Sequence, residues 1–290
     1  MRDERTPLPD LPERYAVMGN PVSHSRSPAI HRLFARQFGD HIDYTAIEVD
    51  LDGFAEAVRR FRSTGGQGLN VTVPFKLEAF RLADVCTDLA KQAQAANTLR
   101  FTNDGTIEAH NTDGLGLVRD LARLLGVGWR ARGGPLLSGK SVLLLGAGGA
   151  VRGVLAQLLE CVPEAVVIAN RTISRAQELV RPGGLSAMRA SGFQDLAGQH
   201  FDVVINGTSA GLKGEAPPLP RGLFATGALA YDMMYGDRPT PFMDYAARDG
   251  AAIISDGLGM LVEQAAESYC FWHGKRPDTQ IVLKALRPGS

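Results

Sequence analysis

The chain has 290 residues, 44% of them hydrophobic, and its 31 basic side chains balance its 31 acidic ones. This length predicts two modest domains with apolar cores. The zero net charge gives no basis for a nucleic-acid or anionic-membrane partner. No apolar run approaches the roughly 20 residues that span a bilayer, so a transmembrane helix is excluded as well.

The N-terminus and the cysteines bear on location. The first ten residues, MRDERTPLPD, have charges and prolines and lack an apolar segment, which predicts a disordered leader and not a secretory signal. Cys86, Cys161 and Cys270 are far apart in apolar, helix-like surroundings, so we expect buried thiols in a reducing cytoplasm. Neither they nor the six histidines show metal-ligand spacing, and no metal site is expected.

The first half of the chain alternates strand-like and helix-like segments, which predicts an α/β domain. Its last two strands form a hairpin, because the sequence Asn-Asp-Gly at residues 103–105 is a typical turn. The expected strands are residues 15–18, 45–49, 68–73, 97–102 and 106–110, and the expected helices are 28–38 and 52–62.

The second half alternates strand and helix in the order of a doubly wound parallel sheet. A last helix over residues 258–273 has an apolar stripe and is expected to pack back on the first domain. The predicted domains are residues 12–113 with 257–290, and residues 114–256. The expected strands of the second are 141–145, 166–169, 185–188, 202–205, 228–232 and 251–254, with helices at 174–180 and 240–248.

A glycine-rich segment, KSVLLLGAGGAVRG at residues 140–153, joins a predicted strand to a predicted helix. Gly146 allows the tight turn of a dinucleotide-binding loop, and Gly148 allows a pyrophosphate to approach the helix N-terminus. Val151 stands where the fingerprint has a third Gly or Ala, so the match is loose. By itself the segment is also compatible with a plain strand-to-helix turn.

The residues after the next predicted strand distinguish NADP from NAD. A dinucleotide-binding fold usually has a carboxylate there, about 20 residues past the loop, which binds the ribose hydroxyl. This chain has Asn170, Arg171 and, one helical turn later, Arg175. Guanidinium groups match phosphate oxygens and a carboxylate would repel them, so the sequence predicts NADP.

The segment GNPVSHSRSP precedes the first predicted helix. Ser27 is a suitable N-cap for that helix, with Pro28 at N1 and Gly39 at the C-cap. Capping leaves Ser25 and Asn20 unexplained. Hydroxyl groups at a helix N-terminus, where backbone N–H groups are free, also form a site for a carboxylate.

Two further segments place polar groups beside predicted helix starts. In LNVTVPFK, Thr72 lies on a strand and Lys76 in the first turn of a helix. The positive end of the macrodipole disfavours a protonated lysine there, which suits proton transfer; a solvated surface lysine is the alternative. AANTLR and HNTDGLG supply Asn97 and Asp113. Asp113 either caps a helix over residues 115–125 or pairs with Lys76 and orients a hydroxyl.

The last candidates come from YDMMYGD and DGLGMLVEQA, which contain Met233, Tyr235, Gly257 and Gln264. Met233 is by default a core residue. Gln264 places an amide in an otherwise apolar helix, which suits either a hydrogen bond to a sugar-like hydroxyl or exposure to water.

The motifs GNPVSHSRSP, LNVTVPFK, AANTLR, NTDGLG, GAGGAVRG, NRT, YDMMY and DGLGMLVEQA occur in this order, and together they resemble the shikimate dehydrogenase family. Only the leader and the loop near residues 130–137 look like additions. The resemblance implies an α/β substrate domain followed by a Rossmann-type NADP domain. It also implies an NADP-dependent oxidoreductase that reversibly reduces 3-dehydroshikimate to shikimate, on the route to chorismate and the aromatic amino acids, as a cytoplasmic monomer or homodimer.

The same resemblance implies a role for each motif residue. Lys76 is the implied proton donor and acceptor, with Asp113 in its hydrogen-bond network. Substrate contacts are implied for Ser25 and Ser27 at the carboxylate, for Thr72, Asn97, Asp113 and Gln264 at ring hydroxyls, and for Tyr235. Cofactor contacts are implied for Gly146, Ala147, Gly148, Gly149, Ala150, Asn170, Arg171, Thr172, Arg175, Met233 and Gly257.

Two other functions are compatible with the same scaffold. A quinate dehydrogenase, often NAD-dependent, would be expected to have an acid after the second strand of the nucleotide-binding domain, where Asn170 stands here. A non-catalytic NADP-sensing protein on the same scaffold would be expected to have lost Lys76 or Asp113, and both are present.

Overall fold

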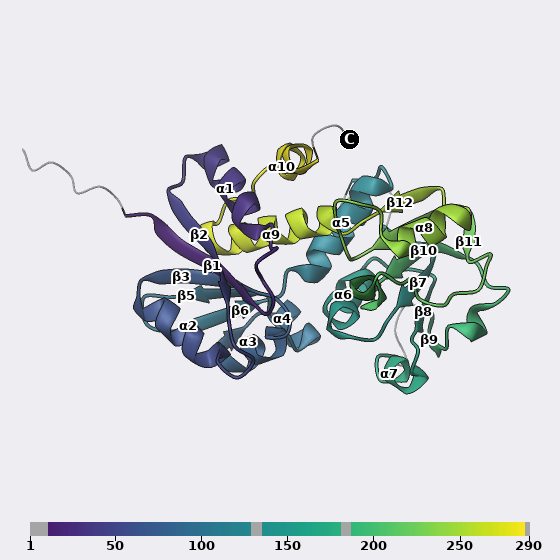
Figure 1. Ribbon diagram of the computed structural model, residues 1–290, viewed down its shortest axis with the longest axis horizontal. Coiled ribbons are helices and arrows are strands. Elements are labelled where there is room, and N and C mark those ends of the chain that lie inside the picture. The colour runs from purple at the N-terminus through teal and green to yellow at the C-terminus, as the bar shows by residue number, and fades with distance from the viewer. Residues whose placement is uncertain (1–10, 129–134, 181–186, 288–290) are drawn as a thin grey trace, which may run out of the picture. The chain divides into compact units, whose positions relative to one another are not determined.

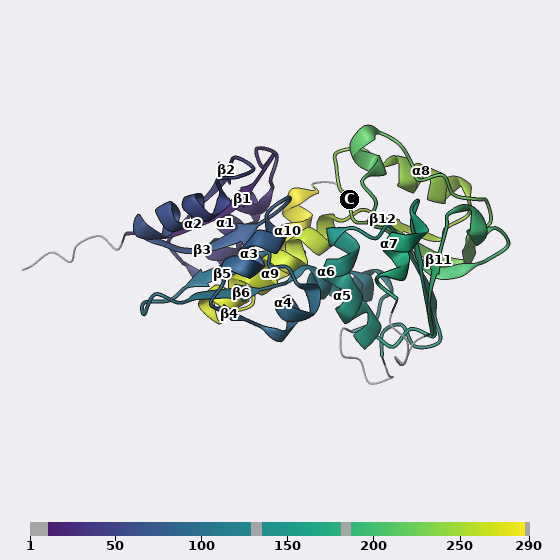
Figure 2. The ribbon, with the colours of Figure 1, turned by 90° about the horizontal axis from the view of Figure 1, so that it is seen from below.

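The structure is a computed structural model that describes residues 11–128, 135–180 and 187–287 (Figure 1). It divides into two compact units (Figure 2). Unit 1 comprises the described parts of Met1–Thr87, Ala96–His110 and Ser268–Ser290, and unit 2 comprises those of Asp88–Ala95 and Asn111–Glu267. The predicted leader and residues 130–134 of the predicted extra loop lie outside the described residues.

Unit 1 is built on a mixed sheet. Among its described residues the strand order is β2-β1-β3-β5-β6-β4, in which β1 is parallel to β2 and β3, and β5 forms the predicted antiparallel hairpin with β6. Its strands are β1 (Glu13–Gly19), β2 (Ile42–Glu48), β3 (Gly66–Val71), β4 (Val85–Cys86), β5 (Thr98–Phe101) and β6 (Ile107–His110). Its helices are α1 (Ser27–Phe38), α2 (Phe54–Ser63), α3 (Lys76–Leu82) and α10 (Thr279–Leu286).

The alternation of side chains along β1 explains how this sheet is covered on both faces. Ala16 and Met18 belong to the apolar cluster that α2 and α3 complete with Phe54 and Phe75. Tyr15 and Val17, which alternate with them along the strand, belong to a second cluster on the other face, where Tyr15 stacks on Trp272 with ring centroids 4.6 Å apart. Figure 1 shows α2 and α3 on one side of this sheet and α1 on the other.

A fully buried histidine lies in the second of these layers. The ring of His31, on α1, stacks on Tyr44 with centroids 4.3 Å apart. Burial, aided by repulsion from His273, lowers the pKa of His31 from 6.5 to about 3. His31 is therefore neutral in the folded protein at neutral pH.

This shift makes the stability of the protein depend on pH. Between pH 6.5 and about 3 the unfolded chain binds a proton at His31 that the folded chain does not, so stability is lost as the pH falls through this window. The shift predicts a loss of about 2 kcal/mol from His31 between pH 8 and pH 5. The free energy of unfolding, measured with denaturant at pH 8 and pH 5, should fall by about 2 kcal/mol less in His31→Phe than in the wild type. The exposed His200→Gln should keep the full loss, and an equal loss in all three proteins would contradict the assignment.

Unit 2 contains a doubly wound parallel sheet, as predicted. Its strand order is β12-β11-β10-β7-β8-β9 and every pairing between these strands is parallel. Its strands are β7 (Ser141–Leu145), β8 (Ala165–Ala169), β9 (Ala187–Ser191), β10 (Phe201–Asn206), β11 (Phe224–Asp232) and β12 (Ile253–Ser255). Its helices are α4 (Asp88–Ala93), α5 (Asp113–Leu124), α6 (Gly149–Glu160), α7 (Ile173–Gln177) and α8 (Pro241–Arg248), with 3₁₀ turns at Gln194–Leu196 and Ala210–Lys213.

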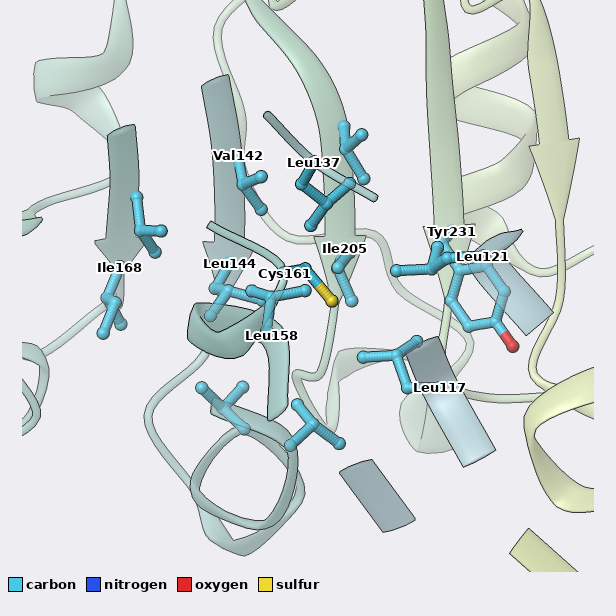
Figure 3. Packing of buried hydrophobic residues seen from close by; sticks show 14 of the residues in the cluster. Leu117, Leu121, Leu137, Val142, Leu144, Leu158, Cys161, Ile168, Ile205 and Tyr231 are labelled. Carbon is cyan, nitrogen blue, oxygen red and sulfur yellow. The ribbon is translucent and has the colours of Figure 1, made fainter. Parts of the chain in front are cut away.

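Apolar runs in these strands fill the core of unit 2. Figure 3 shows Val142, Leu144 and Ile205 on adjacent strands, facing Leu158 of α6 and Leu117 of α5. Because β7 and β8 lie between parallel neighbours, both of their faces are buried, which is why their sequences, SVLLL and AVVIA, are almost continuous hydrophobic runs.

The observed units differ from the predicted domains in three places. Residues 88–95, which include α4, and residues 111–113 belong to unit 2, and the division falls within α9 (Leu258–His273) after Glu267. α5 packs on α6. At Gly116 of α5 an added Cβ would lie 2.7 Å from Cβ of Gln264 and 2.8 Å from the Met260 carbonyl oxygen, so the glycine allows α9 to approach α5 closely. Tyr231 at the end of β11 accepts a hydrogen bond from the Met260 N–H. These contacts place the start of α5 and the first part of α9 in unit 2.

Candidate active site

One edge of the unit 1 sheet collects most of the predicted substrate residues. β1 and β3 are parallel, so their carboxyl ends share this edge, and β5 runs antiparallel to β3 and begins there. The Asn20 N–H donates to the Val73 carbonyl at 3.0 Å, which joins the two segments that leave the edge. The residues that follow these strand ends or precede β5 are Ser25, Ser27, Thr72, Lys76 and Asn97.

The prediction that Ser27 is the N-cap of α1 is wrong. Arg26 occupies the cap without a side-chain bond, and Ser27 is the first residue of the helix. Ser25 Oγ accepts the Ser27 N–H at 3.3 Å and so does what a capping side chain would do. The Ser27 hydroxyl instead bonds to Tyr44, where burial raises the pKa of the phenol and this bond lowers it. The predicted C-cap is confirmed, since Gly39 has φ 71°.

Lys76 is the first residue of α3, in the first turn as predicted. Its carbonyl oxygen accepts the Ala96 N–H at 2.8 Å, so the start of α3 is tied to the residue before Asn97. Thr72 lies one residue past the end of β3, and its carbonyl accepts the Phe75 N–H at 3.0 Å. Backbone bonds therefore hold together the segments that carry these three side chains.

In unit 2, α5 and α9 bring Asp113 and Gln264 onto neighbouring helices. Asp113 is the first residue of α5 and 6% exposed, so the alternative that it caps a helix starting at residue 115 is wrong. Asn111 Oδ1 accepts the Asp113 N–H at 3.1 Å. Thr112 Oγ1 donates to Gln264 Oε1 at 3.3 Å, and Gln264 Nε2 donates to the Leu261 carbonyl at 2.9 Å, so the amide of Gln264 has a defined orientation.

The glycine-rich loop follows β7 at the point where the strand order reverses, between β7 and β10. Gly146 has φ 105°, and a Cβ there would lie 3.0 Å from the Gly207 carbonyl oxygen, so this position requires glycine. Gly148 is the N-cap of α6, and a Cβ on Gly148 or Gly149 would meet no protein atom within 4 Å. A helix N-terminus at a switch point is where parallel sheets of this kind bind phosphate groups. Ala147 and Ala150 complete the loop.

The predicted cofactor residues after β8 form a short exposed turn into α7. Asn170 Nδ2 donates to the Thr172 carbonyl at 2.8 Å, which closes the turn. Arg171 and Arg175 are exposed, and in the described part of the chain neither guanidinium has a hydrogen bond or an ion pair. Arg152, in contrast, pairs with Glu178 at 2.9 Å. Two uncommitted guanidinium groups beside the turn suit a phosphate monoester.

Met233 and Gly257 lie at the carboxyl edge of the same sheet. A Cβ added to Gly207 would lie 3.0 Å from Met233 Sδ and 2.7 Å from Val151 Cγ2, so Met233 packs against Gly207, and it also packs against the apolar core of unit 2. A Cβ on Gly257 would collide with the Met233 carbonyl. Tyr235 is half-buried and follows β11 by three residues.

Sequence patterns did not identify a buried polar cluster that holds this edge together. Asn206 Nδ2 donates to Asp232 Oδ1 at 3.1 Å, and Thr240 donates to Asp232 Oδ2 at 2.5 Å. Burial raises the pKa of Asp232, and these hydrogen bonds oppose the rise. Asn206 ends β10 and Asp232 ends β11, so the only sequence clue was a polar residue at the end of each apolar strand.

The same three-residue turn recurs in five segments of the two units. A side-chain oxygen accepts the backbone N–H two residues further along the chain, at 3.0 to 3.3 Å. The pairs are Ser25 with Ser27, Asn111 with Asp113, Asn206 with Thr208, Asp232 with Met234, and Asp256 with Leu258.

Other classes of site find little support in the described residues. No group of His, Cys, Asp and Glu side chains among them could hold a metal ion. The three cysteines are free, as predicted, although Cys86 and Cys270 are only half-buried. No helix within the described ranges is long and apolar enough to cross a membrane.

Comparison with known proteins identifies the family. The model of the shikimate dehydrogenase substrate binding domain matches residues 17–99, that of shikimate / quinate 5-dehydrogenase matches 131–213, and that of the shikimate 5'-dehydrogenase C-terminal domain matches 257–287. The shikimate dehydrogenase (NADP(+)) of Aromatoleum aromaticum is 55% identical over 279 residues, which cover 95% of this chain and 97% of that protein.

Solved structures agree with this. An Ael1 enzyme from Pseudomonas putida superposes with a TM-score of 0.83 at 47% identity, covering 94% of this chain and 98% of that one. A shikimate dehydrogenase crystallised in complex with NADP+ gives a TM-score of 0.80 at 27% identity, covering 95% of this chain and 94% of that one. In sequence and in fold, over nearly its whole length, the chain belongs to the shikimate dehydrogenase family.

Proposed function

We propose that this protein is an NADP-dependent shikimate dehydrogenase, which reversibly reduces 3-dehydroshikimate to shikimate on the route to chorismate and the aromatic amino acids. The observation that carries the proposal is that this member of the family has both a polar substrate-type edge and a nucleotide-binding loop. One sheet edge of unit 1 collects hydroxyl, amide and ammonium groups, and the switch point of unit 2 carries the glycine loop with two guanidinium groups beside it. We expect it to act in the cytoplasm as a monomer or homodimer.

The residues of unit 2 fit NADP. The N-terminus of α6 lacks a side-chain cap and an acidic residue in its first turn, which suits the pyrophosphate. Arg171 and Arg175 suit the 2′-phosphate, and Asn170 and Thr172 shape the turn that carries them. Met233 and Gly257 would lie along the cofactor. NADPH supplies a hydride when it is bound.

The substrate roles follow from the chemistry of each group. Ser25 and Ser27 would bind the carboxylate, and Thr72, Asn97, Asp113 and Gln264 would bind ring hydroxyls, with Tyr235 near the substrate. Hydride addition to the ketone carbon leaves negative charge on its oxygen, which must take up one proton. Lys76 would donate that proton, and in the reverse direction would accept it from the hydroxyl. Asp113 would stabilise the protonated form of Lys76 and orient the hydroxyl.

The test is the rate of NADPH formation or NADH formation, measured by absorbance, with shikimate or quinate crossed against NADP or NAD. Strong turnover with shikimate and NADP alone would support the proposal at both ends of the site. Turnover of quinate, or equal use of NAD, would support the alternative of a broader quinate/shikimate dehydrogenase. Binding of NADP without turnover in any combination would favour the NADP-sensing alternative.

A further inference from the structure

A chain of buried polar side chains in unit 1 ends at the amide of Asn97. The Tyr44 hydroxyl donates to Asn70 Oδ1 at 2.7 Å, and Asn70 Nδ2 donates to the Asn97 carbonyl oxygen at 3.1 Å and to Ser268 Oγ at 2.9 Å. Thr98 Oγ1 lies 2.7 Å from Ser268 Oγ and donates to Asn97 Oδ1 at 3.0 Å. None of the five residues is more than 5% exposed.

The direction of these hydrogen bonds follows from one group that can only accept. The backbone carbonyl of Asn97 has no proton, so the Asn70 atom beside it must be Nδ2, and Asn70 Oδ1 must turn to the Tyr44 hydroxyl. Asn70 Nδ2 also lies 3.2 Å from Thr98 Oγ1, so its second proton is shared between Ser268 Oγ and Thr98 Oγ1. The Thr98 hydroxyl donates its one proton to Asn97 Oδ1 at 3.0 Å, so Ser268 Oγ is the donor in the 2.7 Å contact between Ser268 and Thr98.

This arrangement gives the Asn97 side chain a fixed polarity. A side-chain amide has an accepting and a donating side, and a buried donor held on Oδ1 prevents the two from exchanging places. Asn97 Nδ2 is then on the side away from Thr98. An amide held in this way can donate to a ligand oxygen without losing the bond on its other side.

We propose that Thr98 is a positioning residue that fixes the amide of Asn97 so that its Nδ2 group donates to a ring hydroxyl of the substrate. The inference rests on the proposed function, in which Asn97 contacts the substrate. Removing the Thr98 hydroxyl takes away this donor to Asn97 Oδ1, which favours rotation of the amide and presents an acceptor where a donor is needed. Substrate binding should weaken while the hydride and proton steps, which use other groups, continue.

The test compares Thr98→Val, which keeps the shape of the side chain and removes the hydroxyl, with Thr98→Ser, which keeps the hydroxyl. Thr98→Val should raise the KM for shikimate roughly 5- to 50-fold with kcat within about 3-fold of the wild type, and Thr98→Ser should stay within about 3-fold in both. In an Asn97→Ala background, Thr98→Val should have no further effect on KM. The Kd for NADP, measured by fluorescence, should not change, because the predicted NADP residues are in unit 2.

Shikimate analogues that each lack one ring hydroxyl distinguish a positioning role from a loss of packing, because a packing defect would weaken the binding of every analogue alike. The hydroxyl bound by Asn97 is the one whose removal weakens binding to the wild type but not to Asn97→Ala, and Thr98→Val should lose sensitivity to that same hydroxyl. An unchanged KM in Thr98→Val, or effects that add in the double variant, would overturn the positioning role. An unchanged KM in Asn97→Ala would instead overturn the proposed substrate role of Asn97. If Thr98→Val does not fold, Thr98→Ala carries the same expectations.

Discussion

Replacing Lys76 with alanine is expected to lower kcat by roughly 10²- to 10⁴-fold and to raise the KM for shikimate far less. The ammonium group is the proposed source of the proton that the substrate oxygen takes up. Lys76 is the first residue of α3, and its carbonyl is bonded to the Ala96 N–H, so the backbone at this position is held in place in the variant as well. Steady-state kinetics in both directions, at saturating NADP or NADPH, would measure the effect.

The matched control for this variant is Lys91→Ala. Lys91 is an exposed lysine on α4 that pairs with Asp88 at 3.7 Å, and its loss should leave kcat and KM unchanged. A Lys76→Ala enzyme that keeps its kcat and loses only apparent affinity for shikimate would refute the acid–base role and leave Lys76 as a binding residue.

Replacing Arg171 and Arg175 together with alanine is expected to raise the KM for NADPH by roughly 10²-fold and to leave the KM for NADH nearly unchanged. A hydrogen bond to a charged group contributes about 1.5–3 kcal/mol, and neither guanidinium has an ion pair among the described residues that its loss would disrupt. The preference for NADPH over NADH should therefore fall by about the same factor, which coenzyme titrations with saturating 3-dehydroshikimate would show.

Arg248→Ala provides the control for this pair. Arg248 is an exposed arginine of unit 2 on α8 whose side chain donates to the Asp244 carbonyl, far along the sequence from the nucleotide-binding turn. It should leave both coenzyme constants unchanged. If the double variant weakened NADPH and NADH equally, the two arginines would be contacting the part of the coenzyme that both share, and the basis for predicting NADP from Arg171 and Arg175 would be lost.

The fold was largely predictable because its elements follow from local periodicity. The predicted bounds of β7 and α9 match the structure, since a buried apolar run and a long apolar stripe each have a clear start and end. α10 was not predicted as a separate helix. Its N-cap is Asp278, whose Oδ1 accepts the Gln280 and Ile281 N–H groups. The helix is only eight residues long, a length at which helical periodicity is weak evidence.

The candidate site was predictable only in part. Ser25, Lys76 and Arg171 stand out because their motifs are short and contiguous. The supporting side chains do not stand out in the sequence, because Asn70 is 198 residues from Ser268 and 26 from Tyr44, and no local pattern relates them. The incorrect assignment of Ser27 has the same origin. Its N–H donates to Ser25 Oγ and its hydroxyl bonds to Tyr44, and the second of these contacts cannot be read from the local sequence.

The five three-residue turns have a thermodynamic consequence for ligand affinity. Each is closed by a bond between a side chain and a backbone N–H only two residues away, so its shape depends on the chain's own atoms. Ordering the backbone of one residue costs about 1–2 kcal/mol of conformational entropy, and in these turns that cost is met when the protein folds. A molecule that binds against a preorganised turn does not have to supply it again. Affinity for both substrate and coenzyme should accordingly reflect the contacts they form, with little subtracted for ordering the segments that form them.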